Sequence, residues 1–212
     1  MGKTATPPAA RKKSKAKTDD ALASRALKGE FHPHEGDGKF GFARLYWPDG
    51  DGPRASLEGH LAKKRHPAGT GARHRAAARM EVLLPPDAPE EYVDIDRLVQ
   101  RYEEALPSDA STAIAQVTLH FPDAPNLHSK YEESRAWVRE HFVLGMRLPV
   151  ILVLHAPYLV GSDVPGHVHA LVLTAKLSRF GWIGIDEKVS SDAGRKAALR
   201  SWKQYQKECS TS

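Results

Sequence analysis

The 212-residue chain has little of what secreted, membrane-spanning or nucleotide-binding proteins require. Its single cysteine, Cys209, excludes a disulfide within the chain and fits a reducing compartment. No apolar run approaches the length of a membrane-spanning helix, and the N-terminus lacks the apolar stretch of a signal peptide. Phosphate-binding and dinucleotide-binding glycine motifs are missing as well. We therefore expect a soluble, cytoplasmic protein without a membrane span.

Positive charge is concentrated in two segments of the chain. Residues 1–28 hold eight Lys and Arg against Asp19 and Asp20, whereas the whole chain has a net charge of +5. Residues 60–79 carry six basic residues and no acid. Such segments favour a polyanionic partner, and a solvated, disordered arm is the alternative. The residues that we expect to contact nucleic acid are Lys12, Lys13, Lys63, Lys64, Arg65, Arg73, Arg75 and Arg79.

The chain divides into a tail and one domain. Residues 1–29 are basic and low in complexity, so we expect a disordered tail, with a short helix over 19–28. Residues 30–212 have the length of a single domain, and we expect its first residues, 30–38, to form a loop and residues 181–184 a turn. Apolar periodicity predicts strands at 40–47, 76–84, 112–121, 149–155 and 167–174, and helices at 53–66, 94–106, 126–145 and after residue 191. This order predicts an α+β fold, in which helices pack on a largely antiparallel sheet.

Two neighbouring apolar runs end and begin in histidine. The first, residues 149–155, ends at His155, and the second, residues 167–174, begins with His167-Val168-His169 after an eleven-residue gap. Side chains alternate between the two faces of a strand, so His167 and His169 point to the same side. A hairpin of the two strands would place His155 opposite the start of the second. The spacing therefore predicts three imidazoles on a central strand pair, within reach of one divalent ion.

Three histidines on an apolar sheet have one ordinary explanation besides metal binding. Single histidines on such faces are usually core or rim residues held by hydrogen bonds. Three imidazoles together would cost desolvation energy unless a partner accepts their lone pairs. Imidazole nitrogen is a common ligand of divalent metals, and three protein ligands leave coordination positions open for a substrate. We expect a divalent metal ion (Mn, Mg or Zn) bound by His155, His167 and His169.

Short motifs follow one another between residues 78 and 205: Leu84-Pro85-Pro86-Asp87-Ala88-Pro89, Trp137-Val138-x-x-x-Phe142-x-x-Gly145-Met146, His155-x-Pro157, His167-Val168-His169-Ala170-Leu171-Val172-Leu173-Thr174, Gly181-Trp182 and Arg200-x-Trp202. In this order they resemble the MobA/MobL group of plasmid mobilisation relaxases, members of the HUH endonuclease superfamily. The resemblance implies a relaxase-like fold and a metal-assisted transesterification of single-stranded DNA. It also implies that His155, His167 and His169 hold the metal while a tyrosine attacks the phosphate and remains bound to the 5′ end.

The resemblance places the nucleophilic tyrosine on the first helix after the first strand, and residues 56–65 contain no tyrosine. The nearest one is Tyr46, at the end of the preceding strand, and we take it as the candidate nucleophile. Packing of a strand-end aromatic on the core is the ordinary alternative. His60 is a second candidate, as a base or as a direct nucleophile. Tyr102 and Tyr158 are further alternatives.

Three functions remain open at this level. The first is relaxase-like nicking and strand transfer on single-stranded DNA during the mobilisation of a plasmid or another mobile element. The second is a DNA-binding accessory protein of the same fold that lacks the nucleophile. The third is an unrelated metal-dependent hydrolase that uses the same three histidines. The expected partners are single-stranded DNA and other mobilisation proteins.

Overall fold

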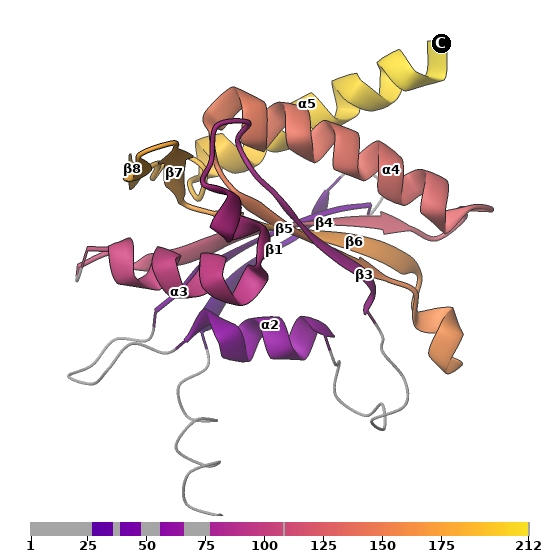
Figure 1. Ribbon diagram of the computed structural model, residues 1–212. Coiled ribbons are helices and arrows are strands. Elements are labelled where there is room, and N and C mark those ends of the chain that lie inside the picture. Colours follow the sequence, from indigo (N-terminus) through magenta and orange to yellow (C-terminus); the bar gives the residue numbers. More distant parts are fainter. Residues whose placement is uncertain (1–26, 36–38, 48–55, 66–76, 108, 212) are drawn as a thin grey trace, which may run out of the picture.

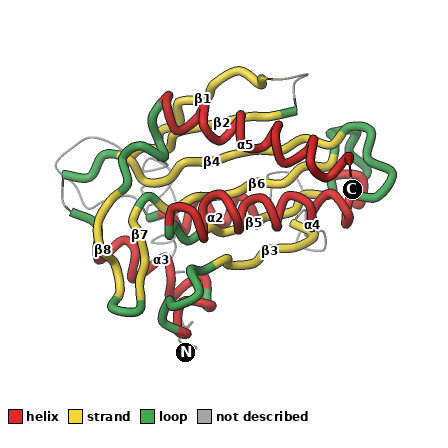
Figure 2. Tube along the Cα trace, turned by 90° about the horizontal axis from the view of Figure 1, so that it is seen from above, coloured by secondary structure: helices red, strands yellow, loops and turns green. Residues whose placement is uncertain are grey.

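One antiparallel sheet forms the centre of the molecule. The computed structural model describes residues 27–35, 39–47, 56–65, 77–107 and 109–211. Within these residues, six strands pair in the order β1-β2-β4-β6-β5-β3, with every neighbouring pair antiparallel (Figure 2). The strands are β1 (Lys28–Glu35), β2 (Phe40–Tyr46), β3 (Ala77–Leu83), β4 (Thr112–Phe121), β5 (Val150–His155) and β6 (Gly166–Leu173). A separate hairpin consists of β7 (Ala175–Ser178) and β8 (Gly181–Ile185).

Helices cover both faces of this sheet. Helices α4 and α5 lie on one face, and α2 and α3 lie on the other (Figure 1). The helices are α2 (Leu57–Arg65), α3 (Ile95–Ala105), α4 (Leu127–Val138) and α5 (Asp192–Thr211), with a π-helical turn η2 (Arg139–Leu144) and short 3-10 turns η1 (Glu90–Val93) and η3 (Pro157–Val160). The predicted α+β class, with helices packed on a largely antiparallel sheet, is therefore confirmed.

The starts of α3 and α4 follow from their capping residues. The side chain of Asp94 accepts a hydrogen bond from the backbone N–H of Arg97 at 2.7 Å. The side chain of Asn126 accepts one from the backbone N–H of Ser129 at 3.0 Å. Such caps satisfy N–H groups that have no partner within the helix, and each contributes about 1 kcal/mol. Both helices begin where the sequence predicts them.

The core is split by the sheet into two halves, and β4 shows the division. Ala115, Val117 and Leu119 pack towards α4 and α5, whereas Ile114 packs towards α2 and α3. The alternation places Gln116 and Thr118 on the same face as Ile114. Both polar side chains are nevertheless buried. The face covered by α2 and α3 is therefore apolar at one end of the strands and polar at the other.

Three local predictions are wrong. Residues 181–184 belong to strand β8 rather than to a turn, since Leu177 pairs with Trp182 and Ala175 with Ile185. The segment 30–38 was expected to be a loop, but β1 runs from Lys28 to Glu35, which also excludes a helix at residue 28. Strand β1 lies at the edge of the sheet, and its pairing with β2 is irregular between His32 and Glu35, where a proline is tolerated. Most of the predicted tail, residues 1–26, lies outside the described residues.

The helix that begins at α4 ends close to the predicted residue 145, without a glycine cap. It continues through η2, and Gly145, with φ −72°, stays helical instead of adopting the left-handed conformation in which glycine often ends a helix. The chain reverses at Arg147, which has φ 61°. Arg147 is held there because its guanidinium donates to Asp87 at 2.5 Å and to the carbonyl of Leu177 at 3.1 Å.

Candidate metal centre

The hairpin of β5 and β6 brings three histidines together. His155 pairs with His167 across the two strands, and His167 and His169 lie on the same face of β6. One nitrogen from each ring lies within 4.8 Å of one from each of the others. The ring centroids are 4.8–4.9 Å apart. The convergence that the spacing predicts is present.

Each imidazole uses one nitrogen in a hydrogen bond to an oxygen. His155 Nε2 lies 2.8 Å from the backbone carbonyl of Lys64, and His167 Nδ1 lies 2.8 Å from that of Pro165. His169 Nδ1 lies 2.9 Å from Thr118 Oγ1. A carbonyl oxygen only accepts hydrogen bonds, so the first two ring nitrogens carry the proton. Oxygen partners of this kind fix the tautomer and the orientation of metal-binding histidines.

The tautomers leave two lone pairs facing each other. In neutral His155 and His167, the remaining nitrogens are His155 Nδ1 and His167 Nε2, and they lie 3.1 Å apart. Neither of them has a proton to donate to the other. Two acceptors at hydrogen-bond distance repel unless a cation lies between them or one ring is charged. The donor set therefore fits a divalent cation shared by the rings.

Burial favours the neutral, metal-binding form of these rings. Desolvation lowers the pKa of His155 to about 4, with a smaller lowering from the neighbouring charges of His167 and Lys64. Desolvation also lowers the pKa of His167, and it lowers that of His169 well below the usual histidine range. A metal ligand must be deprotonated, so the three rings are ready to bind a cation at neutral pH.

Helix α2 lies over the histidines and adds two polar side chains. Lys64 Nζ is 3.3 Å from His169 Nε2, and its ammonium donates to that lone pair. His60 lies one helical turn before Lys64, and its Nε2 is 3.3 Å from Gln116 Oε1. Burial lowers the pKa of Lys64 to about 8 and that of His60 to about 4. The positive charge of the Lys64 ammonium therefore lies beside the three histidines.

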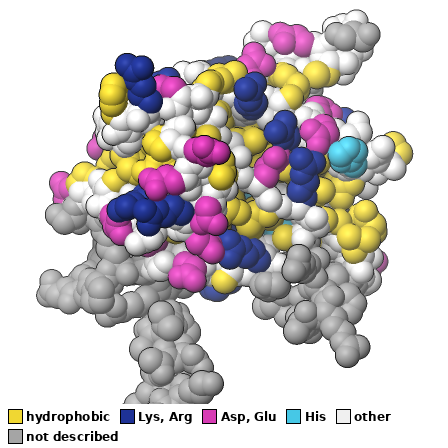
Figure 3. All heavy atoms as spheres, viewed as in Figure 1, with side chains coloured by type: hydrophobic (Ala, Val, Ile, Leu, Met, Phe, Trp, Pro, Cys, Tyr) yellow, Lys and Arg dark blue, Asp and Glu magenta, His cyan; other side chains and the backbone are white. Residues whose placement is uncertain are grey.

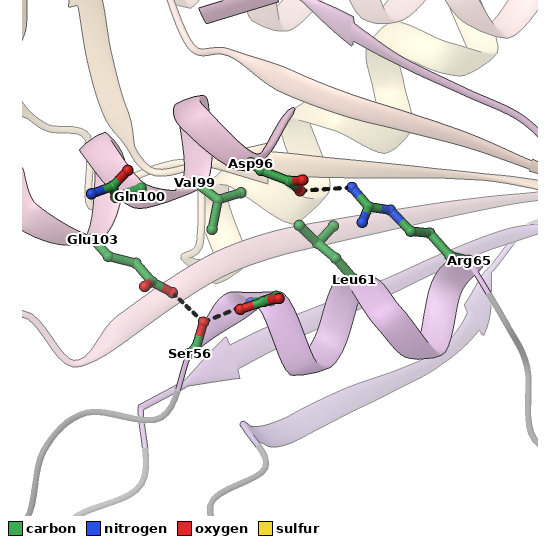
Figure 4. Close-up of a pocket in the computed structure, with 8 residues that line it drawn as sticks. Ser56, Leu61, Arg65, Asp96, Val99, Gln100 and Glu103 are labelled. Atoms are coloured by element: carbon green, nitrogen blue, oxygen red, sulfur yellow. Dashed lines mark hydrogen bonds and ion pairs between the residues drawn. The ribbon is translucent and has the colours of Figure 1, made fainter. Parts of the chain in front are cut away.

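Contacts with α3 hold α2 at both ends (Figure 4). At its start, the carboxylate of Glu103 accepts hydrogen bonds from Leu57 N at 2.5 Å and from Ser56 Oγ at 3.3 Å. At its end, Arg65 forms an ion pair with Asp96 at 2.9 Å. Between these ends lies a cavity of about 340 Å³, bordered by the buried side chain of Leu61. The two contacts set the position of α2, and thereby of Lys64, over the sheet.

Tyr46 does not lie beside the three histidines. It follows Phe42 and Arg44 along β2, and Phe42 packs in the core beneath α4 and α5. Its hydroxyl donates to Glu30 at 3.0 Å, and Arg44, which also contacts Glu30, forms an ion pair with Asp192 of α5. These contacts place Tyr46 on the opposite face of the sheet, so the strand end does not present its oxygen to the metal ligands.

The remaining candidate nucleophiles differ in their surroundings. Tyr102 is fully buried, and its hydroxyl donates to the carbonyl of Ala113 at 2.5 Å. Tyr158 is exposed on η3, three residues after His155. His60 lies on the histidine face, as described above. His60 contacts Gln116, which in turn contacts His169.

The basic residues expected to contact nucleic acid have different partners. Lys64 contacts the histidines, and Lys63 is exposed on α2. Arg65 is paired with Asp96, and Arg79 with Glu132 on α4. Figure 3 shows basic and acidic side chains interspersed over the face that it presents, rather than a continuous positive surface. Lys12, Lys13, Arg73 and Arg75 lie outside the described residues.

Three polar residues of β4 belong to this centre and were not singled out from the sequence. Gln116 and Thr118 contact His169 Nδ1 at 3.4 and 2.9 Å, and the ring of His120 lies 5.4 Å from that of His167. The signal is present in the sequence, because Gln116, Thr118 and His120 alternate with Ala115, Val117 and Leu119. Such alternation predicts a polar face on this strand, and the packing of α2 over that face makes it a buried polar site.

Comparison with known proteins supports the fold. No protein family and no curated protein matches the sequence. A solved structure that concerns the molecular basis of vancomycin resistance transfer in Staphylococcus aureus matches with a TM-score of 0.52 and 14% identity. The match covers 62% of this chain and 69% of that one. At this identity the similarity shows a shared fold. None of the helices in the described residues is long and apolar enough to cross a membrane.

Proposed function

We propose that this protein is a relaxase-like DNA-processing protein that binds a divalent metal on His155, His167 and His169 and nicks single-stranded DNA at that centre. One observation carries the proposal. The unprotonated nitrogens His155 Nδ1 and His167 Nε2 face each other at 3.1 Å, and the hydrogen bond from the other nitrogen of each ring to a backbone carbonyl holds them there. The similarity in fold to a structure concerned with resistance transfer supports a role in the mobilisation of a plasmid or another mobile element. The MobA/MobL assignment rests on the order of the sequence motifs.

The chemistry of the site suits a phosphodiester. A bound divalent ion would neutralise charge that develops on the non-bridging oxygens of the phosphate. Lys64 supplies a second positive charge at the same place, 3.3 Å from His169. Lys63, Arg65 and Arg79, with the basic residues of the tail and of 66–76, are proposed to contact the backbone of the strand. The other expected partners, further mobilisation proteins, and a location in the cytoplasm belong to the same proposal.

Strand transfer requires a nucleophile within reach of the phosphate at the histidines. Tyr46 lies on the opposite face of the sheet, and the Tyr102 hydroxyl is buried in a hydrogen bond. These placements favour, as a second candidate function, a DNA-binding accessory protein that keeps the fold and the metal. The third possibility is a hydrolase in which water attacks, since three histidines leave coordination positions open.

One experiment separates these functions. The full-length protein is incubated with Mn²⁺ and a labelled single-stranded oligonucleotide, and the products are resolved on a denaturing gel. The proposal predicts that the unchanged protein and Tyr46→Phe both cleave the strand and form a protein–DNA adduct. The His167→Ala/His169→Ala variant should form neither product. An adduct that also disappears in His60→Gln would assign the attack to that ring.

The other outcomes identify the alternatives. Cleavage without an adduct would indicate attack by water and would support the hydrolase. Binding of the oligonucleotide without cleavage would support the accessory protein. Neither binding nor cleavage, in a protein that takes up metal normally, would contradict a role on single-stranded DNA.

A further inference from the structure

The loop that joins the two metal-bearing strands exposes an apolar surface. Tyr158 is 62% exposed, Leu159 58% and Val164 53%. Most large apolar side chains of a folded domain are buried, and a group of exposed ones close together in the chain indicates a contact surface. We refer to Tyr158, Leu159 and Val164 as the hairpin platform.

The platform is an ordered structure tied to the histidines. Within it, Gly161 N donates to the carbonyl of Tyr158 at 3.1 Å, and Ser162 N donates to that of Pro157 at 3.1 Å. Gly161 takes the left-handed conformation, φ 74°, that ends the turn. On the other side of the loop, the carbonyl of Pro165 holds the ring of His167. The same loop therefore orients a metal ligand and carries the exposed side chains.

Chain geometry limits the distance between the platform and the metal centre. Tyr158 follows His155 by three residues, and Val164 precedes His167 by three. Three residues span at most about 11 Å. Successive phosphates of one strand advance by about 3.4 Å along the axis of B-form DNA and by more in an extended single strand, so this reach covers at most about three nucleotides. A strand whose phosphate lies at the histidines would have its neighbouring bases within reach of the platform.

The composition of the loop indicates bases rather than phosphates as the occupant. Residues 157–166 contain no Lys or Arg, and Asp163 is their only charged residue. A phosphate would gain nothing here and would be repelled by the carboxylate. An unpaired base presents an apolar face to an aromatic ring, and such stacking tolerates any base. Bases in a duplex are already stacked on both sides, so this surface would select a single strand.

We propose that the hairpin platform stacks an unpaired base of the DNA strand, with the Tyr158 ring as its main contact, within about three nucleotides of the phosphate at the metal centre. The inference rests on the proposed function and names how that site recognises a single strand. Leu159 and Val164 are exposed apolar side chains of the same loop.

The test measures the affinity of the full-length protein for two labelled oligonucleotides by fluorescence anisotropy. One is a 20-nucleotide oligothymidylate, and the other is a 20-unit backbone of abasic phosphates. Tyr158→Ala should weaken binding of the oligothymidylate by roughly fivefold to a hundredfold, and Tyr158→Phe should bind it like the unchanged protein because the ring is kept. All three proteins should bind the abasic backbone equally. Phe180→Ala removes an aromatic ring that is 83% exposed on the β7–β8 turn, and this control should leave both affinities unchanged.

Each other result rejects the platform. Unchanged oligothymidylate binding by Tyr158→Ala, or an equal loss on the abasic backbone, would show that no base stacks on the ring. An equal loss of oligothymidylate affinity in Phe180→Ala would show that any exposed aromatic ring has this effect, and would contradict a specific role of the hairpin platform. If Tyr158→Ala changes only self-association in sedimentation, the surface joins two copies of the chain. Failure of the unchanged protein to bind oligothymidylate while it takes up metal would reject the proposed function together with the platform.

Discussion

Each of the three histidine rings at the β5–β6 hairpin is oriented by a hydrogen bond to an oxygen atom. The oxygen of Thr118 holds the ring of His169 from behind, at 2.9 Å from Nδ1. The carbonyls of Lys64 and Pro165 do the same for the other two rings. Backbone carbonyls cannot be removed by substitution, so Thr118 is the partner on which this role can be tested.

We predict that Thr118→Val weakens metal binding by about tenfold to a hundredfold. Valine keeps the shape of threonine but cannot accept the proton of His169, so the ring loses its fixed tautomer. Calorimetric titration with Mn²⁺ or Zn²⁺ measures the effect. Thr118→Ser, which keeps the hydroxyl, is the matched control and should bind nearly as the unchanged protein does. Equal affinity in both variants would show that Thr118 does not orient the ring.

Lys64 should act on metal and on DNA in opposite directions. Its ammonium lies 3.3 Å from His169 Nε2, where it opposes the arrival of a second cation. Lys64→Met should therefore raise the affinity for the metal and lower that for single-stranded DNA, whereas Lys64→Arg should keep the charge and with it the DNA affinity. A side chain that only filled space would change neither affinity in this pattern. Metal titration and oligonucleotide binding on the same preparations distinguish the two cases.

At the scale of elements, α2 depends on α3 for its position. Glu103 of α3 accepts the first backbone N–H of α2, at Leu57. We predict that Glu103→Ala lowers the free energy of unfolding by about 1 kcal/mol, because that N–H loses its partner. Urea denaturation measures the change. Glu104→Ala removes a carboxylate from the same helix that pairs with exposed Arg101, and this control should leave the free energy of unfolding nearly unchanged.

A structural consequence would accompany this loss. Since α2 carries Lys64 and His60 over the histidines, a shifted α2 should also weaken the contact between Lys64 and His169. Metal affinity in Glu103→Ala should then fall, because the same shift withdraws the Lys64 carbonyl that orients His155, whereas Lys64→Met leaves that carbonyl in place. If stability falls and metal affinity stays constant, α2 keeps its place without the cap.

Elements with regular periodicity were predictable from the sequence, and those that depend on pairing were not. The runs of β5 and β6 are buried and β-branched, and they predict strands and the histidine hairpin. Strand β8 was missed because Gly181 and Gly184, both with positive φ, are typical of a turn. Its strand character comes from pairing with β7, which local sequence does not encode.

The convergence of the three histidines could be predicted from their spacing, and their surroundings could not. His155 and His167 meet because a hairpin joins neighbouring strands, which is a local event. Lys64 meets His169 across 105 residues, through the packing of α2 on the sheet, and no pattern in the sequence reports such a contact. The same limit applies to the wrong placement of Tyr46. The face of the sheet that its side chain occupies is set by the packing of core residues such as Phe42 beneath α4 and α5, and the local sequence does not report that packing.

For the whole molecule, buried neutral histidines predict acid sensitivity. The pKa of His60 is lowered to about 4 and that of His155 to about 4, chiefly by desolvation. Below pH 6.5 the unfolded chain therefore binds more protons than the folded one, and the free energy of unfolding falls as the pH decreases from about 6.5 to 4. Above pH 6.5 these groups are neutral in both states, and stability should not change on their account.

Urea denaturation at pH 7.0 and pH 5.0 tests this dependence. The loss should amount to a few kcal/mol at most and should be smaller in His60→Gln, which cannot gain a proton. Equal stability of the unchanged protein at the two pH values would mean that the rings are not buried in their neutral form.

The three-histidine metal centre is the claim on which the proposed function depends, and calorimetric titration of the apo protein with Mn²⁺ and with Zn²⁺ at pH 7 tests it most directly. The unchanged protein should bind one ion, and the His167→Ala/His169→Ala variant should bind none at the same concentrations while it unfolds at a similar urea concentration. Equal uptake by the two folded proteins would contradict the account, because the ion would then be bound elsewhere.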